Sequence, residues 1–149
     1  MADYTSDLAN ARKLDGDIVA AGQPTAAQLD AARREGVHTV VNLRPAGEFD
    51  AFDEAAHVRD AGMTYVHIPV AGPDDINDAS ARRLDEALSA EGGVPALVHC
   101  ASGNRVGALL AYRARHIQGR SADEAMKIGR AAGLNPKSPL LAAVQKKLG

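Results

Sequence analysis

The sequence predicts an α/β domain with a mostly parallel central sheet flanked by helices. Short apolar runs bounded by Gly and Pro are typical of buried strands. Segments that open with helix-capping residues separate these runs along the chain. Strands that alternate with helices usually pair in parallel, because each helix crosses over one face of the sheet. These two observations predict the fold class.

The expected elements follow one another in a simple order. Residues 1–16 are polar and are expected to be irregular. Helices without strands between them end the chain, so we expect them to close the fold on one side. The expected strands cover 17–21, 37–43, 64–70 and a run that begins at Ala96. The expected helices run from Thr25 to Gly36, from Phe49 to Ala61, onward from a cap at Asp78, from Val106 to Ile117, from Ser121 to Ala132, and onward from Ser138 and Pro139.

Length and composition indicate a single domain over residues 1–149. An apolar content of 46% supports a buried core, and a net charge of −2 without a basic block gives no indication of nucleic-acid or membrane binding. One cysteine cannot form an internal disulfide, and no apolar signal segment follows Met1. We therefore expect a cytoplasmic protein, without a cofactor, and we predict no oligomeric state. The histidines show no metal-ligand spacing, so no metal site is predicted.

A loop that begins at the single cysteine is the strongest functional signal. Cys100 follows the buried run after Ala96, and Arg105 opens an Ala- and Leu-rich helix. Gly103 permits a tight turn, so that backbone N–H groups, the helix start and the guanidinium converge on one anion site. The same field stabilises a thiolate, which is a nucleophile aimed at the bound anion. The predicted catalytic residues are Cys100 and Arg105, and the predicted substrate-binding residues are Ala101, Ser102, Gly103, Asn104 and Arg105.

This loop resembles the signature of the cysteine-dependent phosphatases, His-Cys-x5-Arg followed by Ser or Thr. His99, Cys100, Gly103 and Arg105 match that pattern, but the spacing is Cys-x4-Arg and Val106 replaces the hydroxyl residue. A six-residue loop from Cys to Arg is also typical of rhodanese sulfurtransferases. Two reactions stay open: hydrolysis of a phosphate monoester through a thiophosphate on Cys100, and transfer of sulfane sulfur through a persulfide on Cys100.

A wider resemblance covers about residues 17–132. The order Gly-Gln-Pro-Thr, Val-Asn-Leu-Arg-Pro with Glu48, the segment from Tyr65 to Val70, and His99-Cys100 is similar to the beta-lactamase hydrolase-like domain family. That family is a short branch of the protein tyrosine and dual-specificity phosphatase superfamily. The resemblance implies a protein tyrosine phosphatase-like fold, a Cys/Arg loop and phosphatase activity on a small anionic or phosphorylated substrate. We favour the phosphatase over the sulfurtransferase on this ground.

Asp74 and Asp75 are the candidates for a general acid. They lie in the loop at 71–77, and related phosphatases place their acid in the corresponding loop. A carboxylic acid there could protonate the leaving alkoxide. The alternative is a solvated turn before the next helix, which Asp78 is expected to cap.

Two further residues lie beside the predicted site. Arg44 is at the carboxyl end of the second strand, so it could bind substrate or simply pair with Glu48. His99 points to the opposite face from Cys100, because side chains alternate along a strand. We expect His99 to support the loop by a hydrogen bond rather than to act as the base.

Two other functions use the same cysteine without turnover. A phosphatase that has lost catalysis could hold a phosphorylated partner. A redox sensor could oxidise Cys100, but it would need an external thiol for reversal, because the chain has no second cysteine.

Overall fold

The computed structural model describes residues 3–149 and confirms the predicted α/β architecture. The strands are β1 (Arg12–Leu14), β2 (Ile18–Ala21), β3 (Thr39–Asn42), β4 (Thr64–His67) and β5 (Ala96–His99). The helices are α1 (Ala26–Arg34), α2 (Glu54–Asp60), α3 (Asp78–Ser89), α4 (Asn104–His116), α5 (Ala122–Ala131) and α6 (Pro139–Leu148), with a 3-10 turn, η1 (Pro73–Asp75). The strands form one sheet in the order β1-β2-β5-β3-β4. All neighbours pair in parallel except β1, which is antiparallel to β2.

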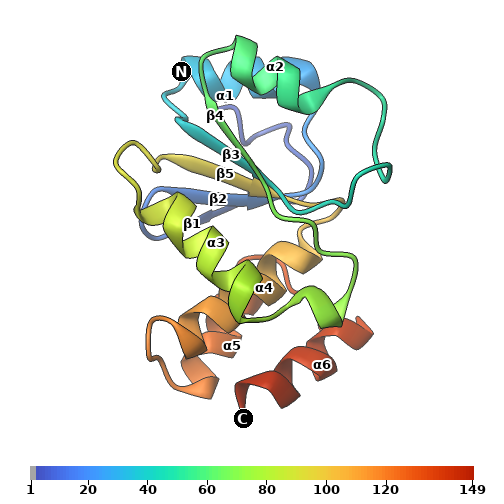
Figure 1. The fold of residues 1–149 in the computed structure, drawn as a ribbon, viewed down its shortest axis with the longest axis vertical. Helices are drawn as coiled ribbons and strands as arrows, with labels where there is room; N and C mark the ends of the chain where they lie inside the picture. Colours follow the sequence, from blue (N-terminus) through green and yellow to red (C-terminus); the bar gives the residue numbers. More distant parts are fainter. Residues whose placement is uncertain (1–2) are drawn as a thin grey trace.

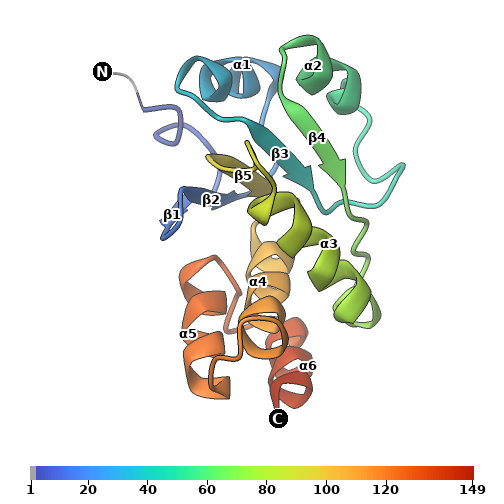
Figure 2. The ribbon, with the colours of Figure 1, turned by 60° about the vertical axis from the view of Figure 1, so that its left-hand side comes forward.

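The sheet separates two layers of helices. Helices α1 and α2 cover one face, and α3 to α6 lie on the other (Figure 1). The strands serve both layers because their side chains alternate. In β5, Leu97 packs with the α1 and α2 layer, whereas Val98 packs with the core under α4. The expected closure by late helices on one side is confirmed, with α5 and α6 flanking α4 (Figure 2).

Strand β5 lies at the centre of the sheet, between β2 and β3. The chain leaves β2 toward α1 on one face and leaves β5 toward α4 on the other. The connections that follow these two neighbouring strands therefore go to opposite faces of the sheet. Open α/β sheets bind ligands in the crevice at such a switch point. The fold places the end of β5, and with it Cys100, at this crevice.

Helix capping accounts for most of the boundaries. Thr25 accepts a hydrogen bond from the Gln28 N–H, and the Gln28 side chain accepts one in return, which confirms the predicted capping box of α1. Ser138 caps α6 with Pro139 at its first position, as expected. The prediction for α3 was wrong by one residue. Asn77 is the cap, and Asp78 instead accepts a hydrogen bond from the Tyr112 hydroxyl (2.7 Å).

The second helix begins later than expected, at Glu54 instead of Phe49. Asp53 caps the helix by accepting a hydrogen bond from the Ala56 N–H (3.1 Å). Asp is favoured at the N-cap of a helix and disfavoured in its interior. Phe49 and Phe52 pack edge to face in the preceding loop, with ring centroids 5.3 Å apart. This loop, residues 44–53, reaches the functional site.

The segment 1–16 is not wholly irregular within the described residues. It contains β1, whose pairing with β2 covers the edge of the sheet. The sequence pattern did not predict this strand, because Arg12 and Lys13 are exposed and only Leu14 packs on the core. The loop expected at 71–77 likewise contains η1. No helix within residues 3–149 is long and apolar enough to cross a membrane.

Helices α4 and α5 approach each other closely through glycine. A Cβ atom on Gly107 of α4 would lie 2.4 Å from the Leu134 nitrogen and 2.5 Å from the Gly129 oxygen. Both neighbours are backbone atoms, which cannot move aside as a flexible side chain can. The same contact fixes the segment after α5 against α4, whose first turn carries Arg105.

We therefore expect Gly107→Ala to destabilise the protein by about 1–3 kcal/mol, the usual cost of overpacking. For a chain of this size, that lowers the melting temperature by roughly 2–12 °C. Gly72→Ala is the matched control, because nothing lies within 4 Å of a Cβ atom there. Thermal denaturation followed by circular dichroism measures both variants. Equal melting temperatures would show that α4 and α5 can separate without cost.

Candidate active site

The thiol of Cys100 lies at the carboxyl end of β5, fully buried. The Gly103 N–H donates a hydrogen bond to its Sγ atom (3.1 Å). Gly103 can do so because its φ of +94° turns the chain sharply into α4, in a region that favours glycine. Helix α4 begins at Asn104, two residues earlier than expected, so Arg105 already lies in its first turn. The structure thus brings Cys100, Gly103 and Arg105 together.

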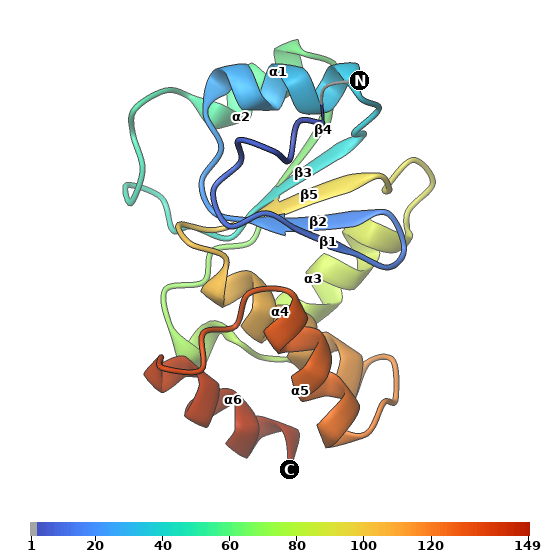
Figure 3. The ribbon, with the colours of Figure 1, turned by 180° about the vertical axis from the view of Figure 1, so that it is seen from behind.

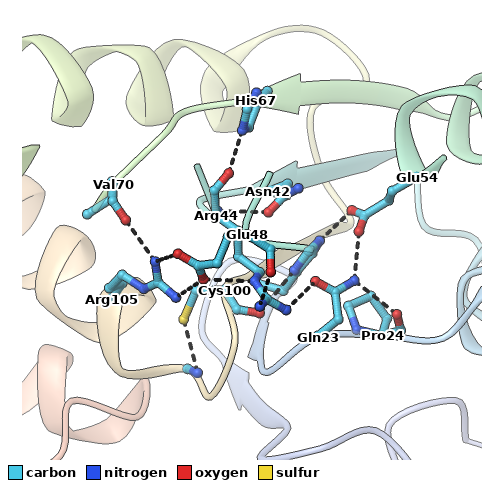
Figure 4. A network of polar contacts seen from close by, with 12 residues as sticks. Gln23, Pro24, Asn42, Arg44, Glu48, Glu54, His67, Val70, Cys100 and Arg105 are labelled. Atoms are coloured by element: carbon cyan, nitrogen blue, oxygen red, sulfur yellow. Dashed lines mark hydrogen bonds and ion pairs between the residues drawn. The ribbon is translucent and has the colours of Figure 1, made fainter. Parts of the chain in front are cut away.

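The guanidinium of Arg105 is held from one side. Its Nη1 donates to Glu48 Oε2 and to the Val70 carbonyl, both at 2.9 Å, and its Nη2 donates to Glu48 Oε1 at 2.5 Å (Figure 4). Glu48 therefore takes the end-on pair of donors. Nε–H and the second Nη2–H make up the other edge of the guanidinium, which is the planar fork that matches two oxygens of one anion.

The charges of this group influence one another. Hydrogen bonds from Arg105 and Arg44 hold the pKa of Glu48 below its ordinary value against the effect of burial, so Glu48 is a carboxylate at neutral pH. In turn, the hydrogen bonds to Glu48 raise the pKa of Arg105, and negative charge on Cys100 adds to this shift. Arg105 is therefore close enough to Cys100 for the charges of the two side chains to interact.

Arg44 makes internal contacts. Its Nε donates to Glu48 Oε1 (2.9 Å), its Nη2 donates to the Glu48 carbonyl (3.1 Å), and its Nη1 donates to Gln23 Oε1 (3.2 Å). The guanidinium also lies over the ring of Phe49, 5.2 Å from the centroid. These contacts favour the structural alternative for Arg44, which fixes the loop that carries Glu48.

His99 is buried on the far side of β5 from Cys100. Its Nε2 lies 2.5 Å from Glu54 Oε2, and both side chains are almost fully buried, with 0% and 4% of their surfaces exposed. Its Nδ1 lies 3.3 Å from the Cys100 carbonyl. Gln23 donates to the other Glu54 oxygen (2.7 Å). His99 thus contacts the first residue of the loop through its ring, while its main partner is Glu54 of α2.

The two acid candidates differ in their surroundings. Asp75 Oδ2 accepts a hydrogen bond from the Ala71 N–H (2.8 Å), which stabilises the turn at η1. The Asp74 side chain is exposed at the surface of the same turn. Val70, directly before this turn, contacts Arg105 through its carbonyl. Asp74 is therefore the better candidate for the acid, and Asp75 has a structural contact.

The remaining loop residues face outward or hold neighbouring segments. The Ala101 carbonyl accepts from the Gln23 N–H (3.1 Å), and the Ser102 carbonyl accepts from Asn10 Nδ2 (3.1 Å). The Asn104 side chain contacts Ser138 Oγ (2.9 Å) and the Asn135 N–H (2.8 Å). In Figure 3 the connection between α5 and α6 passes beside the start of α4, where Asn104 meets it. Within the described chain, no group of three or more His, Cys, Asp and Glu side chains could hold a metal ion.

Sequence reasoning missed two residues of the site. Glu54 lies at the start of α2 and carries no motif, so nothing in the pattern linked it with His99. Gln23 follows the first strand and belongs to the sheet edge where Cys100 lies, so its position was a usable signal. Glu48 was noted in the family pattern and as a partner of Arg44, yet it also binds Arg105 with two hydrogen bonds.

Comparison with known proteins settles the family. The family model described as "Beta-lactamase hydrolase-like protein, phosphatase-like domain" matches residues 10–115, from just before β1 to the last turn of α4. The chain belongs to this family. A beta-lactamase hydrolase-like protein of Xylella fastidiosa (strain Temecula1) is 36% identical over 127 residues. The alignment covers 79% of this chain but 28% of that protein, so the chain spans less than a third of its relative.

Solved structures agree with the phosphatase-like fold. A Neisseria meningitidis protein provisionally named a phosphatase is 25% identical, with a TM-score of 0.71 over 91% of this chain and 96% of that chain. TpbA of P. aeruginosa is 21% identical, with a TM-score of 0.70 over 99% of this chain and 86% of that chain. TpbA has also been solved in complex with phosphotyrosine. The predicted family and protein tyrosine phosphatase-like fold are confirmed, and the sulfurtransferase alternative gains no support.

We expect Cys100 of this phosphatase-like domain to react with iodoacetamide as a thiolate at pH 7. Arg105→Gln removes the adjacent positive charge and should slow alkylation about tenfold, which corresponds to about 1.4 kcal/mol of lost charge stabilisation. Arg82→Gln, an exposed change on α3, is the control. Mass spectrometry of timed samples gives the rates. Equal rates in the two variants would show that Arg105 does not stabilise the thiolate.

Proposed function

We propose that this chain is a cysteine-dependent phosphatase that hydrolyses phosphate monoesters through a thiophosphate on Cys100. One observation carries the proposal: Glu48 and Val70 accept from Nη1 and from the end-on donors of Arg105, and within residues 3–149 no other carboxylate or carbonyl accepts from its Nε/Nη2 edge. That edge is available for a substrate anion. Membership of the phosphatase-like domain family supports the same reaction. Phosphotyrosine in the TpbA complex supports a phosphorylated, anionic ligand for this fold. A cytoplasmic location stays a prediction from the sequence.

The first step is an in-line displacement at phosphorus. The Cys100 thiolate attacks the phosphorus atom, an S–P bond forms, and the bond to the leaving oxygen breaks. The Arg105 fork and the N–H groups of the loop stabilise the negative charge on the equatorial oxygens. Asp74 donates a proton to the leaving alkoxide, giving a neutral alcohol.

The second step releases phosphate. Water attacks the phosphorus of the thiophosphate, the S–P bond breaks, and the thiolate of Cys100 returns with inorganic phosphate as the product. The carboxylate of Asp74, now deprotonated, accepts the proton of the attacking water. Glu48 is a positioning residue in both steps, because it holds the guanidinium in one plane without occupying the Nε edge.

A paired assay tests the reaction. We expect hydrolysis of p-nitrophenyl phosphate, with kcat/KM reduced at least about a thousandfold in Cys100→Ser because the nucleophile is lost. Trapping by rapid acid quench should give a Cys100 adduct with the mass of a phosphoryl group. Formation of thiocyanate from thiosulfate and cyanide is measured on the same preparation. Cys100-dependent thiocyanate with no phosphate release above the variant would contradict the proposal.

The two aspartates give a second test. Asp74→Asn should lower kcat about a hundredfold for a phosphate ester with a poor alkoxide leaving group, because that group needs the proton. The effect on p-nitrophenyl phosphate should be much smaller, since nitrophenolate leaves without a proton. Asp75→Asn is the matched control in the same turn. The Asn amide oxygen can still accept from the Ala71 N–H, so any effect should be small and alike for both substrates. A leaving-group effect confined to Asp75→Asn would reassign the acid.

A further inference from the structure

A second polar pocket adjoins the outer side of the cysteine loop. It has a volume of about 460 Å³, and Ser102 and Asn104 of the loop form part of its wall. The other side is formed by Asn10, by Arg12 of β1, and by Arg130 with the segment after α5. Hydrogen bonds from Asn10 to the Ser102 carbonyl and from the Asn135 N–H to Asn104 tie the pocket wall to the loop. The proposed function uses none of the side chains of this pocket.

The two arginines of this pocket are not neutralised by their surroundings. Across residues 3–149, no ion pair or side-chain hydrogen bond engages Arg12 or Arg130, and no acidic residue lines the pocket. The other late arginines differ in this respect. Arg113 pairs with Asp85 (2.9 Å) and Arg120 pairs with Glu124 (3.3 Å), as solvated helix residues often do.

Two free guanidinium groups around a polar pocket make a site for an anion. A guanidinium offers a planar fork of donors that matches phosphate, and two of them can bind one phosphate from different sides. The whole chain has a net charge of −2, so this local positive charge is not a property of the whole surface. The chemistry of the pocket therefore indicates a phosphate group as its ligand.

The pocket is close enough to Cys100 for one small molecule to reach both. Arg12 pairs with Ala20 in the sheet, and Ala20 pairs with Val98, two residues before Cys100. Neighbouring strands lie about 4.8 Å apart and each strand residue advances about 3.3 Å, so the Cα atoms of Arg12 and Cys100 are separated by roughly 12 Å. The Arg12 side chain extends from its Cα atom, and the phosphoryl group extends from the Cys100 sulfur. The two phosphate positions can therefore be closer together than the two Cα atoms.

We propose that Arg12 and Arg130 bind a second phosphate of the substrate, so that the substrate is a small molecule with at least two phosphate groups. The inference rests on the proposed phosphatase function and narrows its substrate class. The phosphate to be cleaved lies between Cys100 and Arg105, and the second phosphate lies across the loop wall formed by Ser102 and Asn104. The arginine pair thereby favours polyphosphorylated molecules over simple monoesters.

Competitive inhibition of p-nitrophenyl phosphate hydrolysis tests this subsite. The inhibitors are orthophosphate, which fills one anion site, and tripolyphosphate, which can reach both. In the Arg12→Gln/Arg130→Gln double variant, we expect the preference for tripolyphosphate, given by the ratio of the two inhibition constants, to fall at least tenfold. Arg34→Gln is the control, because Arg34 is an exposed arginine of α1 and does not line this pocket. All three side chains are exposed, so the variants keep the core intact.

The outcomes separate the subsite from general charge effects. An unchanged ratio in the double variant, or an equal fall in Arg34→Gln, would overturn the proposal. A peptide with phosphotyrosine beside phosphoserine serves as a further substrate, compared with the singly phosphorylated peptide. Arginine-dependent preference for the doubly phosphorylated peptide, without any preference for tripolyphosphate, would overturn the assignment to a small molecule.

Calorimetry with the Cys100→Ser protein keeps this inference distinct from the proposed reaction. Tripolyphosphate binding to that protein requires no turnover, and its affinity should fall at least tenfold when Arg12 and Arg130 are also replaced. Absence of p-nitrophenyl phosphate hydrolysis with this arginine-dependent binding would refute the phosphatase and leave the subsite standing. Hydrolysis of p-nitrophenyl phosphate without arginine-dependent binding of tripolyphosphate would support the phosphatase and refute the subsite.

Discussion

The ion pair between Glu48 and Arg105 is the interaction on which the rest of the site depends. The Glu48 carboxylate accepts two hydrogen bonds from Arg105 and one from Arg44 (Figure 4). Arg44 also donates a hydrogen bond to the Gln23 side chain. Gln23 in turn donates to Glu54, which contacts His99. One continuous network therefore joins the ends of β2, β3 and β5 to the first turn of α4. It spans the crevice where the helices diverge.

This network serves geometry more than stability. Glu54 and His99 are buried polar side chains, and burying such groups costs free energy that their hydrogen bond can do little more than offset. Removing one partner would leave the other without a buried hydrogen-bond partner, which typically costs about 1–3 kcal/mol. The same logic applies in part to Arg105. Its partners restrict the guanidinium to one orientation, which is the condition for a preorganised anion site.

Much of this arrangement followed from the sequence, and the missing parts have a common cause. Strands, caps and the Cys100 loop depend on neighbours in the chain, so their patterns were visible. The delayed start of α2 was missed because Phe49 and Phe52 are apolar at helical spacing, although they pack in a loop. The contact between Glu54 and His99 joins residues 45 positions apart. Such a pair is created by the crossing of α2 over the sheet, which no local pattern records.

The short loop shows how a departure from a family pattern can be accommodated. The loop has one residue fewer between Cys100 and Arg105 than the phosphatase signature. Within this shorter loop, Gly103 makes a left-handed turn directly before α4, and its N–H donates a hydrogen bond to the sulfur of Cys100. Helix α4 then begins at Asn104, so the guanidinium of Arg105 leaves from the first helical turn, close to the positive helix end.

Val106, the second departure, has a structural explanation in the same turn. Its side chain is fully buried in the core beneath α4, where a hydroxyl would lose its water and need a new partner. The position after Arg105 therefore anchors the start of the helix in this core. Anion recognition then depends on the loop N–H groups, the helix start and the fork of Arg105. Of these, Glu48 controls the orientation of the fork, which ties the chemistry at Cys100 to a carboxylate from a loop on the other side of the crevice.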